Sequence, residues 1–213
     1  MAQVEIGDSA RRRFSQFVKR ECVEIAMGNW QDWQEVYEHK AKPQDNPVLA
    51  KPSRFKRFYM EYSVHRTIRK GRHNDFRKHL AKWIHKVIAD DTGHTLDKFE
   101  KSCRRRFGTF DGKRKMISVI SKVAAFVRPE RFIAWDESAR AGVNLGLGQA
   151  KSAQFESYAC YLAGVDRVWE EYAEELIKAE VRKYKPAKPL LMREAFLRRV
   201  FDVSLMSCGG REF

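Results

Sequence analysis

Long apolar runs are missing from this sequence. No stretch of about 18 apolar residues occurs, so we expect no helix that spans a membrane. The first residues, MAQVEIGDSARRRF, place no apolar segment behind their charges, and we therefore expect no secretory signal peptide. Strict alternation of polar and apolar residues, the pattern of a half-buried strand, is absent or marginal. These absences favour a cytoplasmic protein without β-structure.

Cysteines are few and widely spaced. The four are Cys22, Cys103, Cys160 and Cys208. None belongs to a CxxC pair or has a histidine at ligand spacing, so the sequence supports neither a zinc site nor an iron–sulfur cluster. We expect buried or free thiols in a reducing cytoplasm, with no metal and no organic cofactor.

Negative charge is scarce relative to positive charge. The 213 residues include 42 Lys and Arg against 28 Asp and Glu, which gives a formal net charge of +14. A chain this basic usually binds a polyanion, because each neutralised phosphate releases condensed counterions. DNA is the leading candidate partner. Composition alone does not exclude two other partners, an anionic membrane surface and an acidic protein.

The basic residues are clustered along the chain. Residues 51–90 contain twelve Lys and Arg against Glu61, Asp75 and Asp90, and a second cluster, KSCRRRFGTFDGKRK, spans residues 101–115. Each run can be the solvated face of a helix, but the uneven distribution favours a surface that faces phosphates. The predicted nucleic-acid-binding residues are Arg54, Lys56, Arg57, Arg66, Arg69, Lys70, Arg72, Arg104, Arg105, Arg106, Lys113, Arg114 and Lys115.

Helical periodicity dominates the apolar pattern and predicts an all-α protein. A first helix is expected to end at Gly28, a long one to cover residues 166–184, and a last amphipathic one to carry Leu191 through Phe201. Three prolines between residues 41 and 53 indicate a loop. We place a domain boundary there, between an N-terminal helical segment, 1–50, and a basic helical domain, 51–213. The alternative is one domain of 213 residues.

The segment SKVAAFVRPERFIAWDESAR, residues 121–140, combines a lysine and an aspartate with apolar surroundings. Lys122 lies in a run that is apolar nearly all round, as in a buried helix. A desolvated lysine amine loses its proton more easily and can act as a nucleophile. Pro129 should end this helix, and Asp136 can cap the next one. The alternative is that Lys122 extends to solvent and Asp136 is only an N-cap.

The same segment resembles the helix-hairpin-helix DNA glycosylase superfamily, in particular its 8-oxoguanine DNA glycosylase-like branch. VISKVAAF resembles the hairpin and helix start, with Lys122 in the place of the nucleophilic lysine. FIAWDESAR resembles the aspartate turn, with Asp136 in the place of the catalytic carboxylate. The PERFxxWD turn is also similar to that of small bacterial proteins grouped with this fold. The family hairpin is glycine-rich, whereas MISVIS has no glycine, and the spacing from Lys122 to Asp136 is shorter here.

The resemblance implies a helix-hairpin-helix glycosylase-like core and a role in DNA repair. A damaged base would be extruded from the duplex. Lys122 would attack the sugar carbon while Asp136 stabilises the cationic sugar. Phe132, Trp135 and Tyr158 are the candidate walls of the base pocket.

Two other classes of function stay open. A non-catalytic nucleic-acid-binding protein would use the same basic helices and bury residues 121–140 as core. A subunit of a larger bacterial assembly, for example in anti-phage defence, would dock a protein partner. Its docking surface would be the acidic helix 166–180 or the C-terminal helix.

Overall fold

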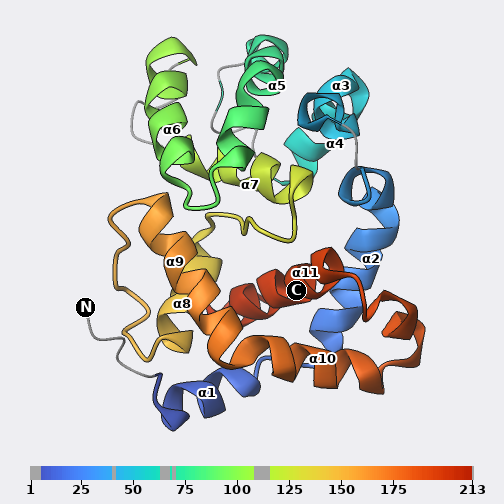
Figure 1. The fold of residues 1–213 in the computed structure, drawn as a ribbon, viewed down its shortest axis with the longest axis vertical. Helices are drawn as coiled ribbons and strands as arrows, with labels where there is room; N and C mark the ends of the chain where they lie inside the picture. The colour runs from blue at the N-terminus through green and yellow to red at the C-terminus, as the bar shows by residue number, and fades with distance from the viewer. Residues whose placement is uncertain (1–5, 40–41, 63–67, 69–70, 108–115, 213) are drawn as a thin grey trace. The chain divides into compact units, whose positions relative to one another are not determined.

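The computed structural model describes residues 6–39, 42–62, 68, 71–107 and 116–212 (Figure 1). Every regular element in these ranges is a helix, which confirms the predicted all-α class. None of the described helices is both long enough and apolar enough to cross a membrane. The helix-hairpin-helix glycosylase-like core stays a prediction.

The helices form two compact units, and each is built from its own core. One unit, here called the terminal unit, combines Met1–Asp32 with Asp136–Phe213; the other, the central unit, is Trp33–Trp135. The chain passes from the first to the second inside a helix, at Trp33, whose backbone leaves the helical region with φ −123° and ψ 16°. These boundaries differ from the expected one near residue 50.

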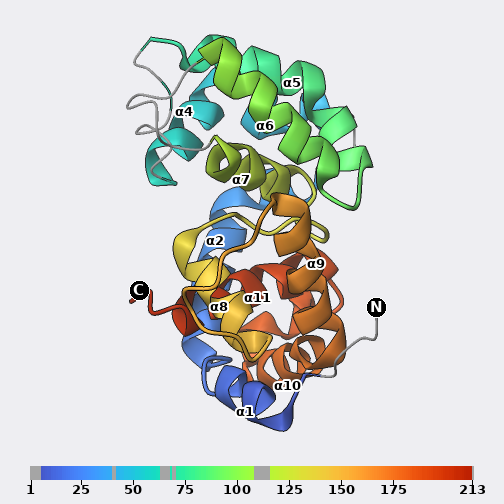
Figure 2. The ribbon, with the colours of Figure 1, turned by 90° about the vertical axis from the view of Figure 1, so that its left-hand side faces the viewer.

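The terminal unit is organised around its C-terminal helix. Its elements are α1 (Asp8–Ser15), the first part of α2 (Arg20–Tyr37), α8 (Glu137–Gly146), α9 (Tyr158–Val168), the π-helical turn η3 (Trp169–Ala173), α10 (Glu174–Lys183), η4 (Lys185–Leu190) and α11 (Glu194–Cys208). α11 packs against α8 and α10 and is buried along most of its length (Figure 2). The helical run of α9, η3 and α10 covers the long helix expected over residues 166–184, but it begins earlier, at Tyr158.

The prediction that the first helix ends at Gly28 is wrong. The chain turns at residues 16–19 instead, and α2 then continues through Gly28 to Tyr37. Val23, Ala26 and Trp30 are buried at helical spacing around the glycine. Their burial stabilises the helix by several kcal/mol, which outweighs the cost of about 1 kcal/mol for a glycine in a helix interior.

The central unit contains η1 (Pro43–Asp45), α3 (Pro47–Ala50), α4 (Pro52–Glu61), α5 (His73–Ala89), α6 (His94–Phe107) and α7 (Ile117–Val127). The interpretation of residues 41–53 as a loop is wrong, because Pro43, Pro47 and Pro52 each begin a helical element. Proline suits the first helical position, where its missing N–H would have no partner in the helix. Asn46 completes the junction: its side chain caps Val48 N at 3.1 Å and donates to the Val36 carbonyl at 3.0 Å.

α7 forms the core of the central unit, where it packs against α3, α5 and α6. Its Phe126 ring lies 4.9–5.1 Å from the rings of four other aromatic residues, Trp33, Tyr37, Phe58 and Tyr62. α7 ends at Val127, two residues before Pro129, as predicted. The chain that follows is tied back to α7, because Ser121 Oγ accepts a hydrogen bond from Trp135 N at 2.9 Å.

Candidate nucleic-acid interface

The net positive charge of the protein belongs to one of its two units. Residues 33–135 contain 25 Lys and Arg against 11 Asp and Glu, whereas the remaining residues contain 17 of each. The central unit therefore carries the whole formal net charge of +14, and the terminal unit is formally neutral. A potential of one sign concentrated on one unit attracts polyanions to that unit.

Two of the predicted nucleic-acid-binding arginines on α4 are held by acidic neighbours. Arg54 forms an ion pair of 2.5 Å with Glu35, and Arg57 forms one of the same length with Glu61. Both guanidinium groups also lie over the Trp33 ring, with Cζ 5.8 Å and 5.0 Å from its centroid. These two arginines cover a buried tryptophan, whereas Lys56 is exposed.

The other predicted basic residues divide between described and undescribed parts of the chain. Arg72 is the N-cap residue of α5, and Arg104, Arg105 and Arg106 form the last turn of α6. Arg104 is 3.9 Å from Glu100. The predicted residues that lie outside the described residues are Arg66, Arg69, Lys70, Lys113, Arg114 and Lys115.

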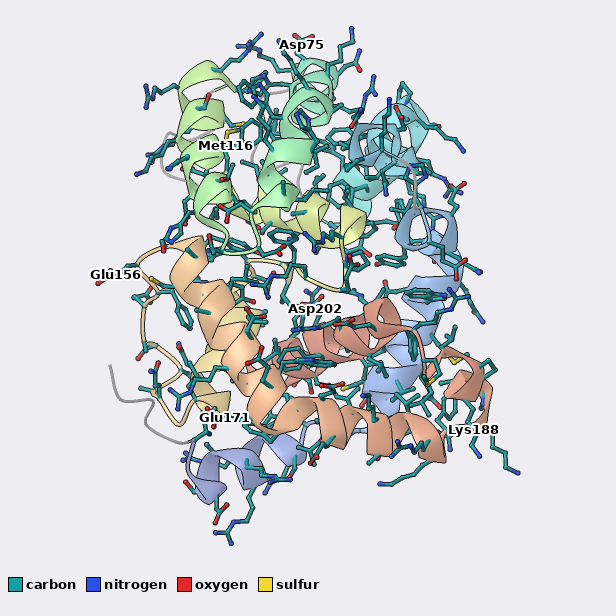
Figure 3. All side chains as sticks on the ribbon, in the orientation of Figure 1. Asp75, Met116, Glu156, Glu171, Lys188 and Asp202 are labelled. Atoms are coloured by element: carbon teal, nitrogen blue, oxygen red, sulfur yellow. The ribbon has the colours of Figure 1, made fainter. Side chains whose placement is uncertain are left out.

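Exposed cations line both helices of the α5–α6 pair. On α5, Lys78, Lys82 and Lys86 recur every fourth residue and share one face of the helix. On α6, Lys98, Lys101 and Arg105 make a similar row. Figure 3 shows nitrogen-tipped side chains on the outer sides of these two helices, with Asp75 near the start of α5. Within the described residues, none of these six cations forms an ion pair.

Arg72, His79 and Arg106 converge on Phe107, and Lys82 lies three residues after His79 on α5; we call these four side chains the cationic cluster. The guanidinium carbons of Arg72 and Arg106 lie 5.3 Å and 5.6 Å from the Phe107 ring centroid, and the His79 ring lies 5.4 Å from it. Burial lowers the pKa of His79 below its ordinary value, and the charges of Arg106 and Lys82 lower it further. One cation from each helix therefore acts on the same imidazole.

A pocket that no sequence pattern predicted lies beside α4 and the first turn of α5. Its volume is about 250 Å³, and the apolar part of its lining is formed by Pro52, Phe55, Tyr59 and Met60. Lys56, His73, Asn74 and Arg77 complete the lining. Arg77 is held in place by hydrogen bonds to the Leu49 carbonyl and to Asn74 Oδ1, the latter 3.0 Å from Nη2.

Lys122 lies on the most open side of α7. Ser118, Lys122 and Ala125 are half-buried and follow one another at helical spacing, while Ser121, Val123 and Ala124 are buried. The Lys122 amine donates a hydrogen bond of 3.2 Å to the Tyr62 main-chain carbonyl. The buried helix was predicted correctly, and this lysine sits at its edge rather than at its centre.

Asp136 acts as the N-cap of α8, as its position after the turn indicates. Its Oδ1 accepts a hydrogen bond from Ser138 N at 3.0 Å. Lys122 belongs to the central unit and Asp136 to the terminal unit. Of the predicted pocket walls, Phe132 and Tyr158 are buried in the core and Trp135 is half-buried, and none of the three lines the pocket beside α4.

The two helices considered for a protein partner are largely engaged within the terminal unit. On the acidic helix, Glu171 pairs with Arg167 at 2.7 Å and Glu174 with Lys178 at 2.5 Å. The C-terminal helix, α11, uses its apolar side chains as the core of the unit. In the described residues α11 therefore offers no apolar face on which a partner could dock.

Comparison of the chain with protein-family models, with curated proteins and with solved structures finds no significant match to any of them.

Proposed function

We propose that this protein binds nucleic acid, duplex DNA in the first instance, through the surface of its central unit. The observation that carries the proposal is the separation of charge between the units. One unit holds the entire net charge of +14, and exposed cations without ionic partners among the described residues line α5 and α6. Cations arranged in this way neutralise phosphates and release counterions.

The test compares two charge reversals that change the net charge equally. In the first variant, Lys78, Lys82 and Lys86 of α5 become glutamate. In the matched control, Arg182, Lys185 and Lys188, three exposed cations of the terminal unit, become glutamate. Duplex affinity is measured by fluorescence anisotropy as a function of salt concentration.

The unmodified protein should show an affinity that falls steeply with salt, with a log–log slope of about −0.9 for each phosphate contact. The α5 variant should bind every duplex sequence more weakly, with a slope shallower by roughly three units. The control should bind almost as the unmodified protein does. Equal losses in the two variants would mean that net charge, and not the central unit, drives binding.

Base excision by a helix-hairpin-helix glycosylase-like core is the second candidate. It is supported by the resemblance of residues 116–140 and by the half-buried amine of Lys122, which donates to a neutral carbonyl. A nucleophilic lysine needs such partial removal from water. In the non-catalytic alternative, Lys122 only closes the edge of α7 and Asp136 only caps α8.

A further inference from the structure

The first residues of α5 point to two different neighbours. Arg72 lies over Phe107 of α6, with its guanidinium carbon 5.3 Å from the ring centroid. The next residue, His73, lies against Tyr59 of α4, with ring centroids 4.6 Å apart. Because consecutive Cα atoms are about 3.8 Å apart, the cationic cluster and the apolar pocket adjoin at this end of α5.

The cationic cluster concentrates like charges on a small surface. Arg72, Lys82 and Arg106 are exposed and form no ion pair with any described residue. Asp75, three residues after Arg72 on the first turn of α5, is an exposed carboxylate beside this arginine. Cations held together repel one another, and a bound anion relieves that repulsion. The N-terminus of the 17-residue helix α5 adds a partial positive charge at the same end.

The pocket offers different chemistry. Phe55 and Tyr59 supply aromatic rings to its apolar lining, and Met60, which also lines it, is 58% exposed. The polar lining consists of Lys56, His73, Asn74 and Arg77, and His73 Nδ1 is a buried atom without a hydrogen-bond partner among the described residues. A planar, polar-edged ring would stack on the aromatic surfaces.

From these two features we infer that the central unit binds unpaired nucleotides of a single-stranded nucleic acid, with a base in the pocket and the adjoining phosphate on the cationic cluster. Single-strand binding proteins combine the same two elements, aromatic surfaces for bases and cations for the backbone. The inference rests on the proposed function and narrows it, because a base stacked inside a duplex cannot enter the pocket.

The test uses the full chain and four labelled probes of equal length at one salt concentration. They are an oligothymidine strand, an oligouridine strand, a mixed-sequence duplex and an abasic deoxyribose-phosphate strand. Charge alone favours the duplex, which has the higher charge density. We expect the base-containing single strands to bind at least 10-fold more tightly than the duplex, and the abasic strand at least 5-fold more weakly than oligothymidine. If oligothymidine binds more tightly than oligouridine, the ligand is assigned as DNA; if oligouridine binds more tightly, it is assigned as RNA.

Matched variants locate the site. Replacing Arg72, Lys82 and Arg106 by alanine should weaken single-strand binding at least 10-fold more than replacing Lys98, Lys101 and Arg105, which are equally exposed on α6.

At the pocket, Met60→Ser should weaken binding of oligothymidine but not of the abasic strand, because it removes an apolar side chain without adding charge. Met192→Ser should have no effect, although Met192 is 90% exposed, because it lies in the other unit. Asp75→Asn should strengthen binding of every probe, because it removes the carboxylate near the cluster.

The outcomes separate the two proposals. If the duplex binds as tightly as the single strands and the two triple variants behave alike, the single-strand inference is wrong and nucleic-acid binding stands. If no probe binds with salt dependence, the proposed function itself fails.

Discussion

Two glycines of the terminal unit should respond in opposite directions to the same substitution. Gly142 lies on α8 where this helix meets α11, and a Cβ at this position would be 2.1 Å from the Leu205 carbonyl oxygen. Gly28 lies on the exposed side of α2, and a Cβ there would have nothing within 4 Å. Both residues belong to the same unit, so both variants report on the same core.

The expected magnitudes follow from these contacts. In Gly142→Ala the obstacle is a helix backbone, which cannot rotate aside as a side chain would, so α8 and α11 must separate locally. Overpacking of this kind costs typically about 1–3 kcal/mol and occasionally more. Alanine also gains about 1 kcal/mol of helix propensity. Because the backbone contact puts the cost at or above the upper end of this range, we expect a net loss of about 2 kcal/mol or more.

Gly28→Ala gains the helix propensity of alanine without a steric clash of the new Cβ, and it should stabilise the unit by about 0.5–1 kcal/mol. The assay is urea denaturation followed by circular dichroism and tryptophan fluorescence. In a chain of this size, 1 kcal/mol shifts the melting temperature by about 2–4 °C, so thermal melting gives a second reading. If Gly142→Ala were as stable as the unmodified protein, the close contact between α8 and α11 would be refuted.

Four further predictions concern titratable and reactive groups. Cys160 is the exposed thiol of the four, so iodoacetamide should modify one cysteine in the folded protein and all four in urea, as counted by intact mass. The lowered pKa of His79 means that the unfolded chain takes up this proton first as pH falls below about 6.5. Stability should therefore decline from about pH 7 to pH 5, and His79→Gln should flatten that decline, as measured by urea midpoints. Burial acts to raise the pKa of Asp90, but hydrogen bonds from Thr92 and Thr95 outweigh it and lower the pKa. Asp90→Asn should therefore cost about 1 kcal/mol near neutral pH, and this cost should shrink progressively as pH falls below 3.8, because the unfolded chain then takes up the proton before the folded protein does. If Lys122 is a nucleophile, borohydride should trap the unmodified protein on DNA with a suitable lesion and should not trap Lys122→Gln; trapping of both variants, or of neither, would contradict that role.

Local patterns in the sequence were sufficient to predict the all-α class and the structural setting of several single residues. Helical spacing of apolar residues predicted an all-α chain, because the period of 3.6 residues is a property of the helix itself. The run around Lys122 predicted a buried helix, and the turn before Asp136 predicted an N-cap. Both predictions depend only on neighbours within a few residues.

Where local signals failed, a longer-range interaction had decided the outcome. Gly28 normally favours a helix end, but buried residues on both sides keep α2 continuous. The prolines of residues 41–53 normally break helices, yet each occupies a position where a helix begins. A proline can mark either the break or the start of a helix, and the packing of the residues that follow it decides which of the two occurs.

The sequence by itself determined that the chain is helical, that it is basic, and where along the chain the positive charges are. Only the tertiary structure decided which of these charges are available. Arg54 and Arg57 pair with acidic residues and cover Trp33, whereas Arg72 and Arg106, 34 positions apart, meet at the ring of Phe107. Coulomb energy depends on distance in space, and residues distant in sequence become neighbours only when the helices pack. For the same reason, the division into a neutral unit and a unit of charge +14 emerges only in the fold, which joins both ends of the chain into one core.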